Sequence, residues 1–250
     1  MSLRIIPKHM QAQGAFNNGQ IVENKPIGFP QDGGHIRPYS NLFYWARAEA
    51  LVDSTIGLHP HQGFEIMSFV LEGRIRHFDT KNNTWKPLEK GDVQIIRAGS
   101  GIQHAENVEK GGVIFQIWVD PDLRKTLSQE ASYDDYPASS FPMLRDNGHE
   151  RTVLIGEGSP LTLDTPSLRI TQERIQGKYT LMPEADSVIS LYVIDGAGTI
   201  SEQSFGKDDF IIIEDAGEDI VLEANGTVSV FRIDAPKDPG YPTYAQRIHR

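Results

Sequence analysis

Histidine and glutamate residues occupy alternate positions in two short stretches of the sequence. His59 and His61 lie in "LHPHQGFE", and His104 and Glu106 lie in "GIQHAE". Side chains alternate between the two faces of a β-strand, so the members of each pair would share one face. Three neutral imidazoles and one carboxylate suit Fe(II), Ni(II), Cu(II), Mn(II) or Zn(II). Octahedral coordination by these four groups would leave positions for a substrate and for a small molecule such as dioxygen.

Other interpretations of these residues compete with the metal site. An isolated H-x-H pair on a strand is more often an incidental surface pair than a ligand pair, but a second pair at a strand position favours the site. Glu65 is a rival carboxylate, because it shares a strand face with His61 unless Gly63 introduces a bulge. His77 is interpreted as structural, with support of the pocket as the alternative. Surface roles are expected for the remaining histidines, His9, His35, His149 and His249.

The elements that would position these residues are short strands. Segments rich in β-formers and separated by turn residues fill residues 43–119 and resume after residue 150. The 23 glycines and 15 prolines favour many short strands over long helices. This pattern predicts an all-β fold of sandwich or barrel type. Residues 123–150 are polar and punctuated by proline, so we expect a linker there, with a short helix near "DLRKTLSQE".

The second half of the sequence repeats the first. Residues 58–73 align with residues 181–196, and "GDVQIIRAG" (91–99) aligns with "DDFIIIEDAG" (208–217). We therefore expect two tandem β-units, one over residues 1–122 with the metal site and one over residues 151–250 without metal ligands. The alignment places the four candidate ligands, His59, His61, His104 and Glu106, opposite Met182, Glu184, Leu222 and Ala224. The imidazoles are therefore not needed for this unit to fold.

Composition excludes several classes of function. The net charge is −10, which disfavours direct binding to nucleic acid or to an anionic membrane surface. The sequence has no cysteine, so disulfides and thiolate chemistry are excluded and a metal must be held by histidine and carboxylate. No run approaches the roughly 20 apolar residues of a membrane span, and the first residues lack a signal-peptide core. A cytoplasmic protein is expected.

The two motifs resemble those of the cupin superfamily and, within it, the pirin family. The resemblance rests on "HPHQGFE…LEG" and on "GDVQIIRAGSGIQHAE", and it covers residues 55–120. It implies two jelly-roll-like barrels, a bicupin in which the C-terminal barrel has lost its metal. Carried over residue by residue, it assigns the metal ligands to His59, His61, His104 and Glu106, and so favours Glu106 over Glu65.

The resemblance also implies a function. It implies a mononuclear iron site and the quercetin 2,3-dioxygenase activity of several members of the family, so a flavonol and dioxygen are the expected small-molecule partners. Glu106 would be the catalytic base that accepts the proton of the flavonol 3-hydroxyl, after loosening from the metal. Two alternatives stay open. One is a regulatory protein that senses metal and redox state and acts through protein partners without turnover, and the other is a cupin enzyme for another small enol or acid.

Overall fold

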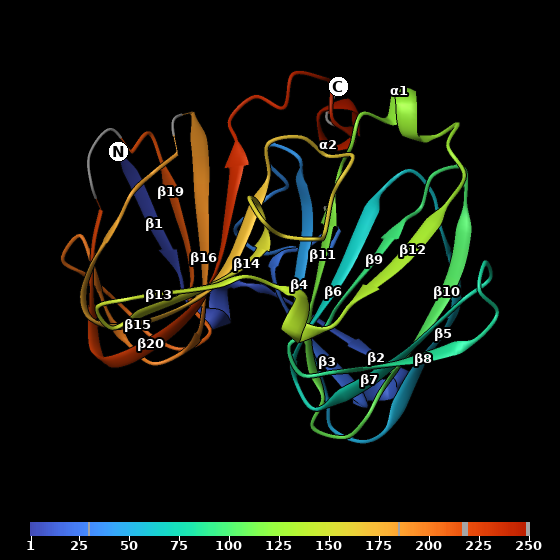
Figure 1. Ribbon diagram of the computed structural model, residues 1–250, viewed down its shortest axis with the longest axis horizontal. Coiled ribbons are helices and arrows are strands. Elements are labelled where there is room, and N and C mark those ends of the chain that lie inside the picture. The colour runs from blue at the N-terminus through green and yellow to red at the C-terminus, as the bar shows by residue number, and fades with distance from the viewer. Residues whose placement is uncertain (30, 185, 217–219, 249–250) are drawn as a thin grey trace. The chain divides into compact units, whose positions relative to one another are not determined.

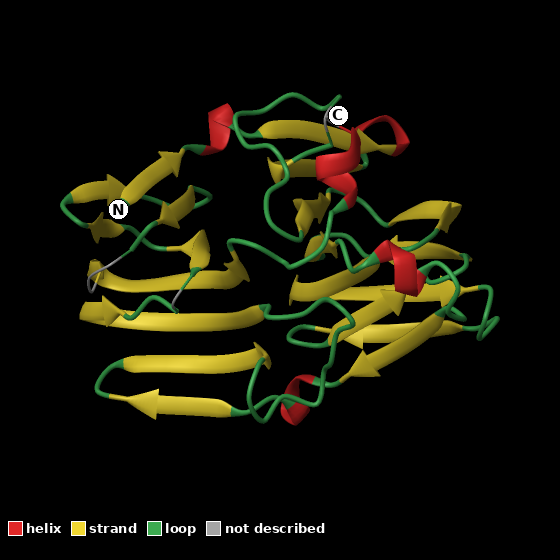
Figure 2. Cartoon of the chain, turned by 90° about the horizontal axis from the view of Figure 1, so that it is seen from above, coloured by secondary structure: helices red, strands yellow, loops and turns green. Residues whose placement is uncertain are grey.

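The computed structural model describes residues 1–29, 31–184, 186–216 and 220–248 (Figure 1). Strands predominate in these residues and the helical segments are short (Figure 2), which confirms the predicted all-β fold. No described helix is long and apolar enough to cross a membrane. Contacts divide the chain into two compact units. The first barrel comprises Gln11–Ala138, Leu163–Pro166 and Gly240–Arg250, and the second barrel comprises Met1–Met10, Ser139–Thr162 and Ser167–Pro239.

The first barrel is built from two sheets that form separate layers (Figure 1). The larger sheet has the order β12-β9-β6-β11-β4-β3-β2, with bounds Ser132–Tyr136, Val93–Arg97, Glu65–Glu72, Val113–Val119, Leu42–Ala50, Ile21–Ile27 and Ala12–Phe16. The smaller sheet has the order β5-β10-β7-β8, with bounds Ser54–His61, Ile102–Val108, Arg74–Asp79 and Trp85–Glu89. Two short helices, α1 (Leu123–Thr126) and α2 (Tyr244–Ile248), complete this unit together with a 3-10 turn at Asn17–Gly19.

The second barrel is a single curved sheet with the order β1-β19-β16-β20-β15-β14-β13, and β17 joins it through β20 while β18 pairs with β17. The bounds in chain order are β1 (Ser2–Ile6), β13 (Met143–Asp146), β14 (His149–Ile155), β15 (Arg169–Leu181), β16 (Ser187–Asp195), β17 (Gly198–Ile200), β18 (Gln203–Phe205), β19 (Phe210–Glu214) and β20 (Ile220–Pro236). Further 3-10 turns occur at Lys8–Met10 and Ala138–Ser140.

The composition of the units differs from the expected ranges 1–122, 123–150 and 151–250. Strand β1 pairs with β19 from Ser2 opposite Glu214 to Ile6 opposite Phe210, so the first residues belong to the second barrel. Strand β12 lies in the expected linker but pairs with β9 of the first barrel. The short helix expected in the linker is α1. The local sequence pattern does not reveal to which barrel β1 and β12 belong, because this depends on the strand with which each one pairs elsewhere in the sequence.

Strand register corrects one part of the internal alignment. Glu106 of β10 lies opposite His77 of β7, and Leu222 of β20 lies opposite Ile200 of β17, the residue that the repeat aligns with His77. The structural counterpart of Glu106 is therefore Leu222, and that of His104 is Ile220. Because His59 lies opposite His104 and Leu181 lies opposite Ile220, the counterpart of His59 is Leu181. The predicted counterparts Met182, Leu222 and Ala224 were wrong, because the connections between strands differ in length in the two barrels.

The second barrel fills the corresponding interior with apolar side chains. Leu181, Ile200 and Leu222 belong to one buried cluster with Val193 and Ala224. Burial of such side chains contributes about 1.5 to 3 kcal/mol each. An apolar core therefore replaces the imidazoles in this copy of the fold.

Helix α2 is attached to the first barrel by a buried carboxylate. Asp120 follows β11 and accepts a hydrogen bond from the backbone N–H of Tyr244 at the start of α2. The backbone carbonyl of Asp120 accepts a second hydrogen bond, 2.6 Å long, from the hydroxyl of Tyr241. Burial raises the pKa of Asp120 to about 6, although the backbone N–H groups of Tyr244 and Ala245 oppose the shift.

This raised pKa predicts a pH-dependent stability. The folded state binds the Asp120 proton more tightly than the unfolded chain does, so this contribution is complete below about pH 4 and is lost as the pH rises through 6. Replacement Asp120→Asn should flatten the fall in the free energy of unfolding between pH 4 and pH 7 by about 1 to 3 kcal/mol. Urea unfolding at several pH values measures this difference. The control is Asp146→Asn at an exposed position, and equal slopes in the two variants would contradict the assignment.

Candidate metal centre

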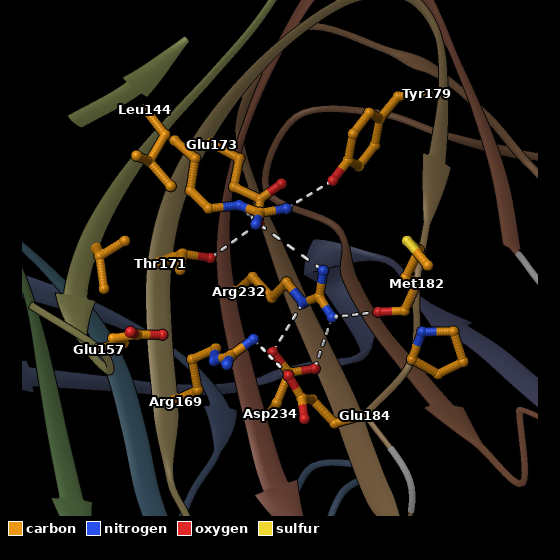
Figure 3. Close-up of a pocket in the computed structure, with 13 residues that line it drawn as sticks. Leu144, Glu157, Arg169, Thr171, Glu173, Tyr179, Met182, Glu184, Arg232 and Asp234 are labelled. Atoms are coloured by element: carbon orange, nitrogen blue, oxygen red, sulfur yellow. Dashed lines mark hydrogen bonds and ion pairs between the residues drawn. The ribbon is translucent and has the colours of Figure 1, made fainter. Parts of the chain in front are cut away.

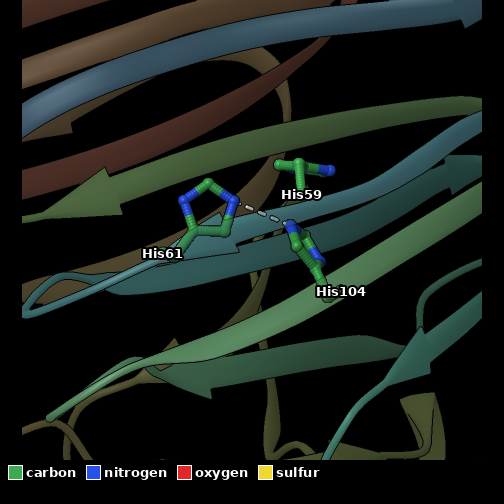
Figure 4. A group of neighbouring side chains, drawn as sticks. All are labelled: His59, His61 and His104. Carbon is green, nitrogen blue, oxygen red and sulfur yellow. Dashed lines mark hydrogen bonds between the residues drawn. The ribbon is translucent and has the colours of Figure 1, made fainter.

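Two neighbouring strands of the smaller sheet carry the predicted ligands. Strands β5 and β10 are antiparallel, and His59 lies directly opposite His104. His61 lies two residues after His59 and therefore projects from the same face of β5. The three rings approach one another from the two strands (Figure 4). The sequence spacing and this register together produce the cluster.

The imidazole nitrogens are close enough to share one ion. One nitrogen from each of His59, His61 and His104 lies within 4.8 Å of the others. Nε2 of His61 and Nε2 of His104 are 2.9 Å apart, and two neutral rings at that distance use one proton between them. Nδ1 of His59 is 2.8 Å from the carbonyl oxygen of Gly57. Because a carbonyl only accepts, Nδ1 carries the proton and Nε2 of His59 offers a lone pair.

The electrostatic environment keeps the rings of His61 and His104 neutral. Burial lowers the pKa of His61 to about 4, with a further decrease from His59. Burial and the neighbouring histidines also hold the pKa of His104 well below its usual value. Neutral imidazole is the form that binds metal ions. The chemistry of the three rings therefore fits a divalent transition metal.

His77 of the neighbouring strand β7 contacts His104 and supports its ring. Its Nε2 is 3.2 Å from Nδ1 of His104, and its ring stacks on Tyr133 with the centroids 4.5 Å apart. When Nε2 of His104 offers its lone pair to a metal, Nδ1–H donates to His77. His77 then carries its own proton on Nδ1, which is 3.9 Å from a carboxylate oxygen of Asp79. The structure thus favours the supporting role that the sequence left as the alternative.

Removal of this support should weaken metal binding. In His77→Phe the ring can still stack on Tyr133, but Nδ1–H of His104 loses its acceptor. Loss of such an outer hydrogen bond typically lowers metal affinity about 10- to 100-fold. Competition between the protein and a chelator for Ni(II) measures the change. The matched control is His9→Phe at an exposed site, and an unchanged affinity in His77→Phe would contradict the role.

Glu106 connects the two sheets of the first barrel beside the histidines. It is fully buried on β10, and its two oxygens accept hydrogen bonds from the hydroxyl of Ser68 (2.8 Å) and the amide of Gln116 (2.7 Å). Burial raises its pKa, while Ser68, His59 and Gln116 oppose the increase. Ser68 lies on β6 and Gln116 on β11 of the larger sheet. Among the described residues, the group of side chains close enough to share a metal ion consists of the three histidines and does not include Glu106. Ligation by Glu106 therefore stays a prediction.

Glu65, the rival carboxylate, is engaged elsewhere. Its oxygens accept hydrogen bonds from the backbone N–H groups of Asp164 and Thr165, each 2.8 Å long, and from the Thr165 hydroxyl. Arg97 lies 3.7 Å away on the neighbouring strand β9. Glu65 is 1% exposed, and it fastens the segment Leu163–Pro166 to β6. The geometry therefore favours Glu106 over Glu65.

A pair of variants separates the roles of the two carboxylates. Glu65→Ala leaves buried N–H groups without an acceptor and should reduce the free energy of unfolding by about 2 to 4 kcal/mol. It should leave the metal content of the protein unchanged. Glu106→Ala should lower the metal content instead. Elemental analysis together with urea unfolding checks both, and a loss of metal from Glu65→Ala alone would reverse the assignment.

The other histidines lie outside this cluster. His9 and His35 are exposed, as expected. His149 is half-buried in the second barrel, where its Nε2 is 2.8 Å from the carboxylate of Glu173. His249 lies outside the described residues.

An aromatic wall borders the histidines on one side. The ring of Trp118 is nearly perpendicular to that of His61, with the centroids 4.7 Å apart. Phe29, Tyr44 and Phe64 pack around Trp118. A depression of about 580 Å³ reaches His61 from the ends of β5 and β10 and is lined by Pro60, Gln62, Thr80 and residues 100–103. The metal cluster thus has an opening for small molecules and flat apolar surfaces nearby.

Comparison with known proteins places these features in a family. The family model described as Pirin matches residues 35–119, which include all four predicted ligands. A pirin-like protein of Caulobacter vibrioides is 42% identical over 167 residues, which cover 64% of this chain and 67% of the relative. The chain belongs to the pirin family. Pirin-like protein 2 of Arabidopsis thaliana is 35% identical over 135 residues, and this pirin spans only 38% of that relative's length.

Solved structures show the same fold. YhhW from Escherichia coli superposes with a TM-score of 0.78 at 20% identity, covering 94% of this pirin and 98% of YhhW. YhhW has also been solved in complex with nickel(II). Quercetin 2,3-dioxygenase from Acinetobacter baumannii gives a TM-score of 0.78 at 20% identity, covering 94% of this pirin and 79% of that chain. The bicupin fold expected from the motifs is confirmed.

Proposed function

We propose that this pirin is a metal-dependent dioxygenase that cleaves a flavonol such as quercetin. The observation that carries the proposal is the convergence of three imidazoles, from His59, His61 and His104, within 4.8 Å. The opening beside His61 and the aromatic side chains around Trp118 suit a flat, hydroxylated aromatic molecule. The name of the Acinetobacter structure supports the choice of substrate.

The proposed cofactor is one Fe(II) ion held by His59, His61, His104 and Glu106. Imidazole and carboxylate also accept Ni(II), Cu(II), Mn(II) and Zn(II), and the nickel complex of YhhW supports a divalent metal in this family. When bound, the ion would lower the pKa of a coordinated hydroxyl and hold substrate and dioxygen together.

The side chains supply positioning and proton transfer. Glu106 acts as the catalytic base and accepts the proton of the flavonol 3-hydroxyl on its carboxylate. Ser68 and Gln116 hold the two oxygens of that carboxylate in place. Trp118 and Phe64 offer apolar faces to the aromatic rings of the flavonol. His77 fixes the ring of His104 through Nδ1.

A turnover assay tests this function. The protein loaded with Fe(II) should consume quercetin and dioxygen together, measured by flavonol absorbance and an oxygen electrode. His104→Ala should abolish turnover because it removes one of the three imidazoles, while the exposed control His9→Ala should retain it.

Two results would contradict the proposal in different ways. One equivalent of bound metal without loss of any flavonol would overturn the dioxygenase activity and favour a regulatory role or another enol substrate. Failure of the wild-type protein to bind a transition metal would overturn the metal centre itself.

A further inference from the structure

The second barrel has a polar pocket beside the positions that correspond to the metal site of the first barrel. In the first barrel Gln116 and Trp118 of β11 lie opposite Ser68 and Ile66 of β6. Ile189 of β16 is the repeat counterpart of Ile66, and it lies opposite Asp234 of β20. By the same register Arg232 occupies the position of Gln116. Arg232 thus replaces Gln116, which holds Glu106 in the first barrel. Asp234 replaces Trp118, which packs on His61.

A cavity of about 690 Å³ opens at these residues. Its polar lining includes Arg151 of β14. Arg169, Glu173, Tyr179, Arg232 and Asp234 converge on the cavity from β15 and β20 (Figure 3). Cavities of roughly 300 to 1,000 Å³ are typical of sites for small molecules. Every one of these residues belongs to the second barrel.

The buried charges of this cavity are balanced. Arg232 donates from Nε and Nη2 to the two oxygens of Asp234, at 2.8 and 2.9 Å. Glu173 is 1% exposed, and Arg151 lies 3.3 Å from one of its oxygens. The floor therefore carries two guanidinium groups and two carboxylates. At the rim, Arg169 pairs with Glu184.

The floor also has hydrogen-bonding capacity that the protein does not use. Nε of Arg151 is buried and lies 3.3 Å from an oxygen of Glu173 as an ion pair, but it donates no hydrogen bond among the described residues. Nη1 of Arg232 is 3.8 Å from Glu173, beyond hydrogen-bond range. Arg151 is held in place by the hydroxyl of Tyr179, which accepts from its Nη2 at 2.6 Å. A buried donor without a partner is costly unless a bound molecule or water satisfies it.

The remaining wall is apolar. Val153, Met182, Pro183 and Leu144 line the cavity beside the charged floor. A ligand that fits both surfaces has an apolar face and oxygen atoms at its edge. Hydroxyl groups suit this floor because each one can accept from a guanidinium and donate to a carboxylate.

We propose that this cavity is a second binding site, for a neutral polyhydroxylated molecule of mono- or disaccharide size. An anion would face the carboxylates of Glu157, Glu173, Glu184 and Asp234, and a cation would face three guanidinium groups. A neutral polyol avoids both conflicts, and its C–H face packs on the apolar wall. Arg151 and Arg232 donate to its hydroxyl oxygens, and Tyr179 positions Arg151.

Calorimetric titration of the full chain with maltose and with myo-inositol tests the site. At least one of them should bind, and Arg151→Gln should weaken that binding by roughly tenfold or more through the loss of charged donors. The matched control is Arg145→Gln on the neighbouring strand β13, where the arginine is exposed and pairs with Glu150; its affinity should equal that of the wild type. Tyr179→Phe, which removes only the hydroxyl that holds Arg151, should also weaken binding.

The outcomes discriminate clearly. Absence of binding of both polyols at millimolar concentration overturns the proposal, and so does tighter binding of citrate than of either polyol. Equal binding by the wild type, Arg151→Gln and Tyr179→Phe, each shown to be folded by circular dichroism, places the polyol elsewhere and also overturns it. The titration needs no metal, so its result is independent of the dioxygenase proposal.

Discussion

The antiparallel pairing of β5 with β10 is the constraint on which the candidate site depends. His59 is opposite His104 in this register, and a slip of one residue would turn each ligand to the other face of its strand. Strand β10 also pairs with β7 on its other side, where Glu106 lies opposite His77. One strand thus carries two predicted ligands and fixes the positions of their partners on both neighbours.

Burial of Glu106 couples the site to the packing of the two sheets. A carboxylate transferred from water to an apolar interior needs hydrogen bonds to offset its desolvation, and Ser68 and Gln116 of the opposite sheet provide them. The same groups would be left without a partner if the sheets separated. The position of Glu106 therefore depends on the packing of the two sheets. A shift of one sheet against the other would break its hydrogen bonds to Ser68 and Gln116.

Much of this arrangement is predictable from the sequence, because alternation along a strand is a local property. The spacing of His59, His61 and His104 predicted that these three residues would lie together, as they do in the structure, and the repeat predicted a second barrel without this cluster. The position of His77 was harder, since its contact with His104 depends on which strand lies beside β10. The charged cavity gave no local signal at all. Arg151, Glu173 and Arg232 are far apart in the sequence, and each resembles an ordinary polar residue on an alternating strand.

The exchange of terminal segments between the two barrels has a consequence for how the chain folds as it is synthesised. Strand β1 is synthesised long before its partner β19, which ends at Glu214, and α2 of the first barrel lies at Tyr244–Ile248. Domains usually fold as they emerge, starting from the N-terminus. Here neither barrel can gather all of its segments until most of the chain has been made. Strand β1 therefore stays without this partner until β19 has been made, and during that time its edge can pair with other chains.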